Sequence, residues 1–197
     1  MWRAELQRTS GSNVKILFLM TMLVLAFHIY NPTAMFQSLQ ATTASPLPVI
    51  GPQSTIVILV EFNDTMHRRS IAEIDHMMNQ ADIYWRNVSL GKITIRWSTT
   101  GWYKLNSSLS YYGVDVGGEG NDTRGTQLIE DALRAADPNV DYSHFNHVLI
   151  VHAGIDQTIS EYGGDLWPHF YPNIGYRSQE RTVYGAMPVS YTHLTLP

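Results

Sequence analysis

The chain has 197 residues, of which 44% are hydrophobic and 15% are charged. This composition is typical of a folded globular protein and not of a disordered one. The formal net charge is −4, and residues 31–197 alone carry 10 basic and 16 acidic residues. No cluster of lysine or arginine occurs, which argues against nucleic-acid binding. Cysteine is absent, which excludes disulfides, thiolate metal sites and cysteine nucleophiles.

The N-terminal end has the pattern of an export segment. Three basic residues, Arg3, Arg8 and Lys15, precede the apolar run Ile16–Ile29. A full membrane span needs about 20 residues, so the run suits the hydrophobic region of a signal peptide better. No strong cleavage site follows, and residues 1–30 are therefore predicted to be a signal peptide or an N-terminal membrane anchor. Residues 31–54 are predicted to be a linker or pro-segment, because they combine small residues and proline without periodicity.

The first half of the expected domain reads strand, helix, strand. The β-branched run Thr55–Phe62 predicts a strand buried on both faces. Ser70 and Glu73 form a capping box, which marks a helix start. Gly91 is placed to end this helix in a left-handed conformation, and Lys92–Trp97 alternates like a half-buried strand. The helix is expected to pack through an apolar stripe at spacings of three and four residues: Ile71, Ile74, Met78, Ala81, Trp85 and Val88.

The second half continues the alternation. Ser98–Gly120 is predicted to be a loop, and Gly117–Gly120 lacks the lysine of a phosphate-binding loop. A helix is expected over Gly125–Ala136, stopped by Asp137-Pro138, and a buried strand over His147–Val151. The inward residues of that helix are expected to be Leu128, Ile129, Ala132, Leu133 and Ala136. The pattern predicts an α/β fold with a mixed or mostly parallel sheet and packed helices.

No metal motif occurs among the eight histidines. An H-E-x-x-H pair would place two imidazoles on one helix face, and no histidine here is followed by glutamate. His144 and His147 are expected to be loop and strand-edge residues, and His76 to be solvated. The segment Asp137–Asp141 resembles the start of an EF-hand, but Tyr142 replaces the required glycine and Val148 the final glutamate. Calcium at a site built from distant ligands stays an open alternative.

Four N-x-[ST] sequons lie in or beside predicted turns. Such sequons accept glycans only on exported chains, so they agree with an export segment. The candidate glycosylation sites are Asn63, Asn87, Asn106 and Asn121.

The last ten residues are unusual. Residues 188–197, PVSYTHLTLP, can be back-translated as CCT GTC TCT TAT ACA CAT CTG ACG CTG CCG. This string resembles the transposon-end adapter of sequencing libraries, read in frame. We therefore expect residues 188–197 to be a non-native adapter-derived tail, the natural sequence to continue differently after Met187, and His193 to be no ligand.

Several segments, in this order along the chain, resemble the N-terminal half of the peptidase domain of immune inhibitor A-like zinc metallopeptidases. The likeness covers about residues 55–187. The segments are the strand Ile56–Phe62, Ser89–Lys92 leading to Trp102-Tyr103, Asp131–Leu133 with Ala136–Pro138 and Val140–Ser143, and Val151–Gly154 with Gln157 and Asp165–His169.

The resemblance implies a partial peptidase domain at residues 55–187, with the fold of the N-terminal subdomain of a zincin-type metallopeptidase, truncated. In that family an H-E-x-x-H segment follows, where zinc-activated water attacks the peptide bond with glutamate as general base. The present chain stops short of that segment, so it is expected to hold no catalytic or metal residue and to be inactive. The expected substrate is a protein or peptide.

Four positions match the family and are interpreted as structural: His152, Gly154, Trp167 and His169. His152 is expected to form a hydrogen bond at a strand end before a sharp turn at Gly154, and Trp167 to act as an aromatic plug. The chain is expected to be extracellular, or anchored in the membrane by an uncleaved N-terminal segment and facing outside. The alternative is a non-catalytic exported surface-binding or envelope protein with the same fold.

Overall fold

The computed structural model describes residues 50–115 and 122–194. The chain divides into two compact units, residues 1–46 and 47–197, and the described residues belong to the second. The predicted export segment, most of the predicted linker, residues Gly117–Gly120 and the sequon at Asn121 lie outside the described residues. Within residues 50–115 and 122–194, no helix combines the length and the apolar character needed to cross a bilayer.

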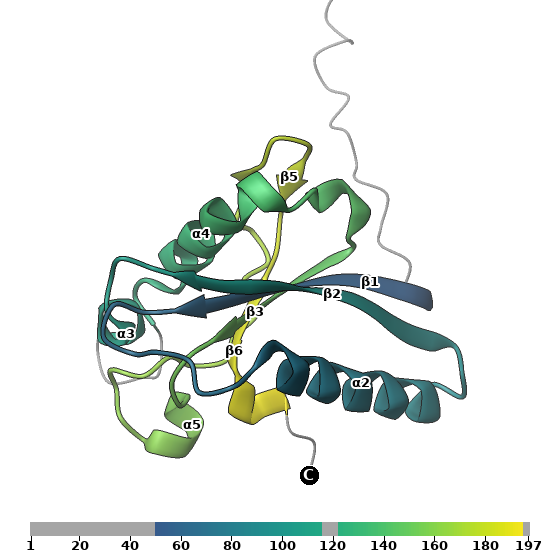
Figure 1. The fold of residues 1–197 in the computed structure, drawn as a ribbon, viewed down its shortest axis with the longest axis horizontal. Coiled ribbons are helices and arrows are strands. Elements are labelled where there is room, and N and C mark those ends of the chain that lie inside the picture. Colours follow the sequence, from purple (N-terminus) through teal and green to yellow (C-terminus); the bar gives the residue numbers. More distant parts are fainter. Residues whose placement is uncertain (1–49, 116–121, 195–197) are drawn as a thin grey trace, which may run out of the picture. The chain divides into compact units, whose positions relative to one another are not determined.

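The described part is an α/β unit built on a four-stranded parallel sheet, which confirms the predicted α/β class with a mostly parallel sheet and packed helices (Figure 1). The sheet order is β2-β1-β3-β6, and β4 and β5 form a separate antiparallel pair. The strands are β1 (Gly51–Glu61), β2 (Ile93–Lys104), β3 (His147–His152), β4 (Tyr176–Arg177), β5 (Thr182–Val183) and β6 (Met187–Ser190). The helices are α2 (Ile71–Val88), α3 (Leu109–Gly113), α4 (Gly125–Ala136) and α5 (Gln157–Ser160), with 3-10 turns at Asp137–Asn139, Tyr142–His144 and Tyr191–Leu194.

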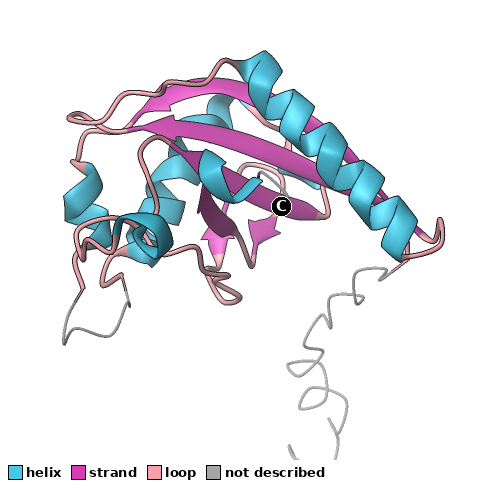
Figure 2. Cartoon of the chain, turned by 90° about the horizontal axis from the view of Figure 1, so that it is seen from below, coloured by secondary structure: helices cyan, strands magenta, loops and turns pink. Residues whose placement is uncertain are grey.

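The central strand β1 is buried on both faces because helices cover both sides of the sheet (Figure 1). Successive side chains of a strand point to opposite faces. Ile56, Ile58 and Val60 therefore join the core that includes Leu128 and Leu133 of α4. Val57 and Leu59 join the second core, with Ile74, Met77 and Met78 of α2. Figure 2 shows α2 lying across the strands on its side of the sheet.

The strands β1 and β2 are longer than predicted. β1 begins at Gly51, inside the expected linker, because the Gly51 amide donates to the carbonyl of Lys92 at 2.7 Å and the ladder continues from there. β2 continues to Lys104 through residues expected to be a loop. A bulge between Val57 and Leu59 interrupts the ladder, and the Leu59 amide donates to the Thr100 hydroxyl at 3.1 Å instead.

The start and the end of α2 agree with the prediction, whereas its packing does not. The capping box of Ser70 and Glu73 is present, Gly91 is left-handed with φ 78°, and His76 is exposed. The predicted stripe is wrong at both ends: Ile71, Trp85 and Val88 are 40%, 45% and 53% exposed. The buried residues of α2 are Ile74, Met77, Met78 and Asp82, so the helix packs on the sheet through its middle and not through its two ends.

The second predicted helix and the strand after it are confirmed. α4 spans Gly125–Ala136 and buries all five expected residues. The α-helix ends at Ala136 because Pro138 has no N–H for the next helical hydrogen bond. A short 3-10 segment, Asp137–Asn139, follows it. β3 spans His147–His152, one residue beyond the prediction. The short strand β4 follows at Tyr176–Arg177.

The first residues of the expected adapter-derived tail lie in the sheet. β6 runs parallel to β3, with Met187 beside Leu149 and Ser190 beside His152. Val189 is 3% exposed and joins the core on the α2 side. Residues 188–190 therefore occupy the outer position of the sheet, next to β3.

Candidate functional site

Polar side chains gather at the edge of the sheet where the parallel strands end. Glu61 ends β1, His152 ends β3 and Ser190 ends β6, and the ladder places Val60 beside His152 and His152 beside Ser190. Ligands of open α/β sheets bind outside the carboxyl ends of the strands. We call Glu61, His67, Trp102, His152 and Asp156 the carboxyl-edge cluster, and it is the candidate functional site.

A carboxylate–imidazole pair forms one half of this cluster. Glu61 Oε2 lies 2.6 Å from His67 Nδ1 and accepts the His67 amide at 3.2 Å. The hydrogen bond from His67 lowers the pKa of Glu61, against the opposing effect of burial. The His67 ring stacks on Trp102 with 4.5 Å between ring centroids and an interplanar angle of 7°. A carboxylate that holds an imidazole in this way fixes its orientation for proton transfer or metal ligation.

Buried hydrogen bonds form the other half. His152 is fully buried, and its Nδ1 lies 2.9 Å from the Ala153 carbonyl oxygen. Asp156, also fully buried, accepts the Thr158 amide at 2.9 Å. It also accepts, at 2.8 Å, the hydroxyl of Ser190, which belongs to the expected adapter-derived tail. This half therefore fixes the strand ends and exposes no nucleophile.

The family-matching positions divide between the core and the surface. His152 forms the expected strand-end hydrogen bond, and Gly154 turns with φ 97°. Trp167 is 38% exposed, so its ring does not plug the core; its backbone amide donates to Asp122 Oδ2 at 3.0 Å. His169 is exposed and packs edge-on against Tyr171. The structure does not bring these four residues into one site.

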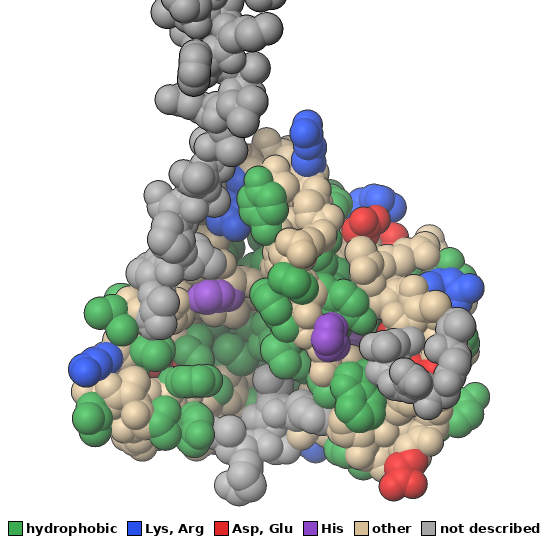
Figure 3. All heavy atoms as spheres, turned by 180° about the vertical axis from the view of Figure 1, so that it is seen from behind, with side chains coloured by type: hydrophobic (Ala, Val, Ile, Leu, Met, Phe, Trp, Pro, Cys, Tyr) green, Lys and Arg blue, Asp and Glu red, His purple; other side chains and the backbone are tan. Residues whose placement is uncertain are grey.

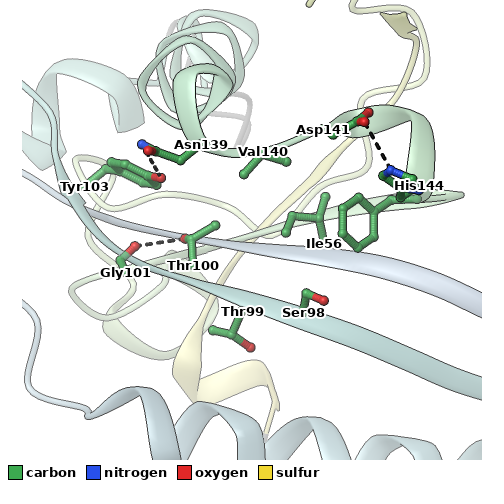
Figure 4. Close-up of a pocket in the computed structure, with 11 residues that line it drawn as sticks. Ile56, Ser98, Thr99, Thr100, Gly101, Tyr103, Asn139, Val140, Asp141 and His144 are labelled. Carbon is green, nitrogen blue, oxygen red and sulfur yellow. Dashed lines mark hydrogen bonds and ion pairs between the residues drawn. The ribbon is translucent and has the colours of Figure 1, made fainter. Parts of the chain in front are cut away.

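His144 and His147 are three positions apart in the sequence, but they have different partners in the structure. His144 Nε2 lies 3.1 Å from Asp141, beside an open pocket of about 500 Å³ between β2 and residues 139–145 (Figure 4). His147 Nε2 lies 2.9 Å from Gln53 Oε1, and burial lowers the pKa of His147. Hydroxyl groups and aliphatic side chains line most of this pocket, and no residue of the carboxyl-edge cluster lines it. The pocket residues are Ile56, Ser98, Thr99, Thr100, Gly101, Tyr103, Asn139, Val140, Asp141, His144 and Phe145.

A pair of aspartates lies on the loops beyond the strand ends. Asp115 and Asp122 form an isolated antiparallel bridge, and Gln157 Nε2 donates to Asp115 Oδ2 at 2.6 Å. Asp115 Oδ1, Asp122 Oδ1 and Gln157 Oε1 are buried without a hydrogen-bond partner in the described part of the chain. Burial and the neighbouring Asp115 charge raise the pKa of Asp122 to about 7, although the Trp167 amide opposes the shift.

The raised pKa of Asp122 predicts a loss of stability as pH rises from about 4 to 7. The carboxyl has a pKa near 3.9 in an unfolded chain, so the folded state binds the extra proton in this window. The protonated Asp122 carboxyl contributes fully to the free energy of unfolding below about pH 4, and this contribution is lost as pH rises through 7. Asp122→Asn should flatten this part of the profile and raise the free energy of unfolding at pH 8 by about 1–2 kcal/mol, after a discount for partial exposure. Urea titrations at pH 4 to 8 measure both effects.

The matched control is Glu130→Gln, which removes one carboxylate from α4 without touching the aspartate pair. It should follow the wild-type profile. If Asp122→Asn loses stability between pH 4 and 7 as the wild type does, another group is responsible for the fall.

Sequence reasoning missed the Glu61–His67 pair, the Asp115–Asp122 pair and the role of Asp156. For the first, a signal was present: an acidic residue at the end of the most apolar strand, with a histidine six positions later. The other two depend on loops that meet only in the folded chain.

No protein-family model matches the chain, and a search of the curated proteins finds no match.

Proposed function

We propose that the chain is the N-terminal part of an exported zinc-dependent endopeptidase whose H-E-x-x-H segment follows Met187 in the intact protein. The observation that supports this best is the parallel pairing of Met187 with Leu149 of β3. A chain that continues from Met187 along β3 reaches the carboxyl edge. A helix that starts there and crosses the strand ends would pass Glu61, at the end of β1, and Trp102, near the end of β2, which are two and three positions away in the sheet.

The zinc ligands of this proposal lie outside the present chain. Within residues 50–115 and 122–194, no three of His, Asp and Glu gather closely enough to hold a metal ion. Zinc, when bound in the intact protein, would supply Lewis-acid polarisation of the scissile carbonyl and activation of water. The described residues would contribute the wall of a cleft, where the Trp102–His67 stack offers a flat surface to a peptide.

The test begins with the genomic DNA beyond the codon of Met187. We expect an H-E-x-x-H motif within the next few dozen codons. The protein expressed from that continuous gene should cleave an unfolded protein substrate, lose the activity with a chelator and regain it with zinc.

The matched controls are the 197-residue chain and the long form with the motif glutamate replaced by glutamine. Both should be inactive, the second by a factor of at least 10². A natural stop codon after Pro197, with residues 188–197 encoded in the genome, would overturn the proposal and favour the non-catalytic surface protein.

We also propose that calcium, if the intact protein binds it, binds between Asp115, Asp122 and Gln157. Three buried oxygen atoms without hydrogen-bond partners in the described part of the chain support this, because calcium prefers carboxylate and amide oxygens. The pH titration of Asp122→Asn, repeated with calcium chloride, tests it. Calcium should stabilise the wild type at pH 8 and have little effect on the variant.

A further inference from the structure

The last two turns of α2 form an apolar surface that nothing in the described part of the chain covers. Every residue from 83 to 88 is exposed. Five of the exposed side chains between residues 83 and 90 are large and hydrophobic, with exposed fractions from 44% to 86%. We call these five the α2-terminal patch: Ile83, Tyr84, Trp85, Val88 and Leu90.

The composition of this patch is that of a bilayer interface. Tyr84 and Trp85 pack edge to face with 5.8 Å between ring centroids, and tryptophan and tyrosine concentrate at the headgroup level of membranes. Lys92 lies beside the patch, and Arg86 lies within it, paired with the buried Asp82 at 2.6 Å. Residues 83–92 add no further acidic residue, whereas residues 31–197 together carry six more acidic than basic residues. Basic groups beside an apolar surface favour anionic lipid headgroups, and the rest of the domain would be repelled by them.

The chain enters the domain at the same end. The Gly51 amide donates to the Lys92 carbonyl at 2.7 Å, so the polypeptide arrives beside the end of α2. Figure 3 shows hydrophobic side chains gathered at its lower left, over the end of the molecule where α2 ends and β1 begins. Twenty residues separate the apolar run Ile16–Ile29 from Ile50. Twenty residues can bridge at most about 70 Å.

We propose that the α2-terminal patch is a second membrane contact, which rests the amino end of the sheet on the bilayer that holds the N-terminal apolar run. Tethering makes this contact intramolecular, so a weak surface affinity is sufficient. The contact places β1, β3 and β6 with their carboxyl ends pointing away from the lipid. The carboxyl-edge cluster would then face the exterior, where a protein substrate can reach it. The inference takes the second alternative for residues 1–30, an uncleaved N-terminal membrane anchor, and it requires an unmodified Asn87.

Site-directed spin labelling of the full chain in vesicles of phosphatidylcholine and phosphatidylglycerol tests the contact. The chain has no cysteine, so Val88→Cys and, as control, Thr126→Cys each carry one nitroxide. Val88 is 53% exposed in α2, and Thr126 is exposed on α4, across the sheet. We expect the ratio of collision rates with oxygen and with a water-soluble nickel complex to be several-fold higher at position 88 than at 126.

Two results would overturn the inference. Equal ratios at both positions would show that the patch faces water. Low collision rates with both reagents at position 88 would show that protein covers it, either residues of this chain or a second copy. An alkaline carbonate wash tests the N-terminal anchor separately from the α2-terminal patch. Release of the chain from the vesicles would contradict the anchor. Retention of the chain together with a water-exposed position 88 would contradict the patch contact alone.

Discussion

Replacing Ile58 by alanine is expected to lower the free energy of unfolding by about 3–4 kcal/mol. Ile58 lies in the middle of β1, between β2 and β3, and is fully buried in the core on the α4 side. Truncation removes three carbon atoms and leaves a cavity that a strand held by two neighbours cannot close. Because domains of this size are stable by only about 5–15 kcal/mol, the loss is a large share of the total.

Urea denaturation of the full chain, followed by tryptophan fluorescence, measures the effect. Ile159→Ala is the matched control, since this isoleucine is 57% exposed in α5. The control should change the free energy by less than about 0.5 kcal/mol. Equal effects of the two substitutions would contradict the three-layer core built on β1.

Replacing Gly113 by alanine should destabilise the domain by about 2–3 kcal/mol, through steric overlap rather than lost burial. A Cβ atom at this position would lie 2.6 Å from the Gly164 carbonyl oxygen and 2.7 Å from the Asp165 carbonyl carbon. Both atoms belong to the backbone, so no side-chain rotation relieves the contact. The segment that carries Asp165 to His169 must move, and near-ultraviolet circular dichroism should report the altered surroundings of Trp167.

Gly101→Ala is the control for this substitution. Gly101 lies in β2, and a Cβ atom there would meet nothing within 4 Å. Alanine at this position should be neutral or slightly stabilising, because it reduces the conformational entropy of the unfolded chain. The predicted contact between α3 and residues 164–165 is wrong if the two alanine variants unfold at the same urea concentration.

Elements with strong local signals could be predicted from the sequence. Ser70 and Glu73 satisfy each other's backbone groups within one helical turn, so α2 begins where the pattern indicates. The 3.6-residue period of α4 and the apolar run of β3 likewise need no distant partner to be recognised.

Elements that depend on distant neighbours were predicted badly. Ser98–Lys104 carries Ser, Thr and Gly and has a weak strand pattern, yet it forms half of β2 because β1 supplies the ladder. The apolar stripe of α2 predicts a contact along its whole length. Only its middle packs, and Asp82 is buried there because it accepts the Ile95 amide at 2.7 Å.

The candidate site depends even more on the tertiary structure. His67 and Trp102 are 35 positions apart and stack only because β1 and β2 end at the same edge. Asp156 and Ser190 meet across a similar separation. The periodicity of a single helix or strand cannot reveal these pairs, because they form only when the chain folds back and brings two elements together.

By itself, the sequence determined the α/β class, the centres of β1, α2, α4 and β3, and the apolar N-terminal run. These features depend on interactions between residues that are close in the sequence: the spacing of apolar residues, helix capping and turn chemistry. The tertiary structure alone decided the sheet order, the carboxyl-edge cluster, the aspartate pair and the uncovered end of α2. Each of these depends on which distant surfaces meet, because burial and hydrogen bonding reward a contact only after the chain has folded back to make it.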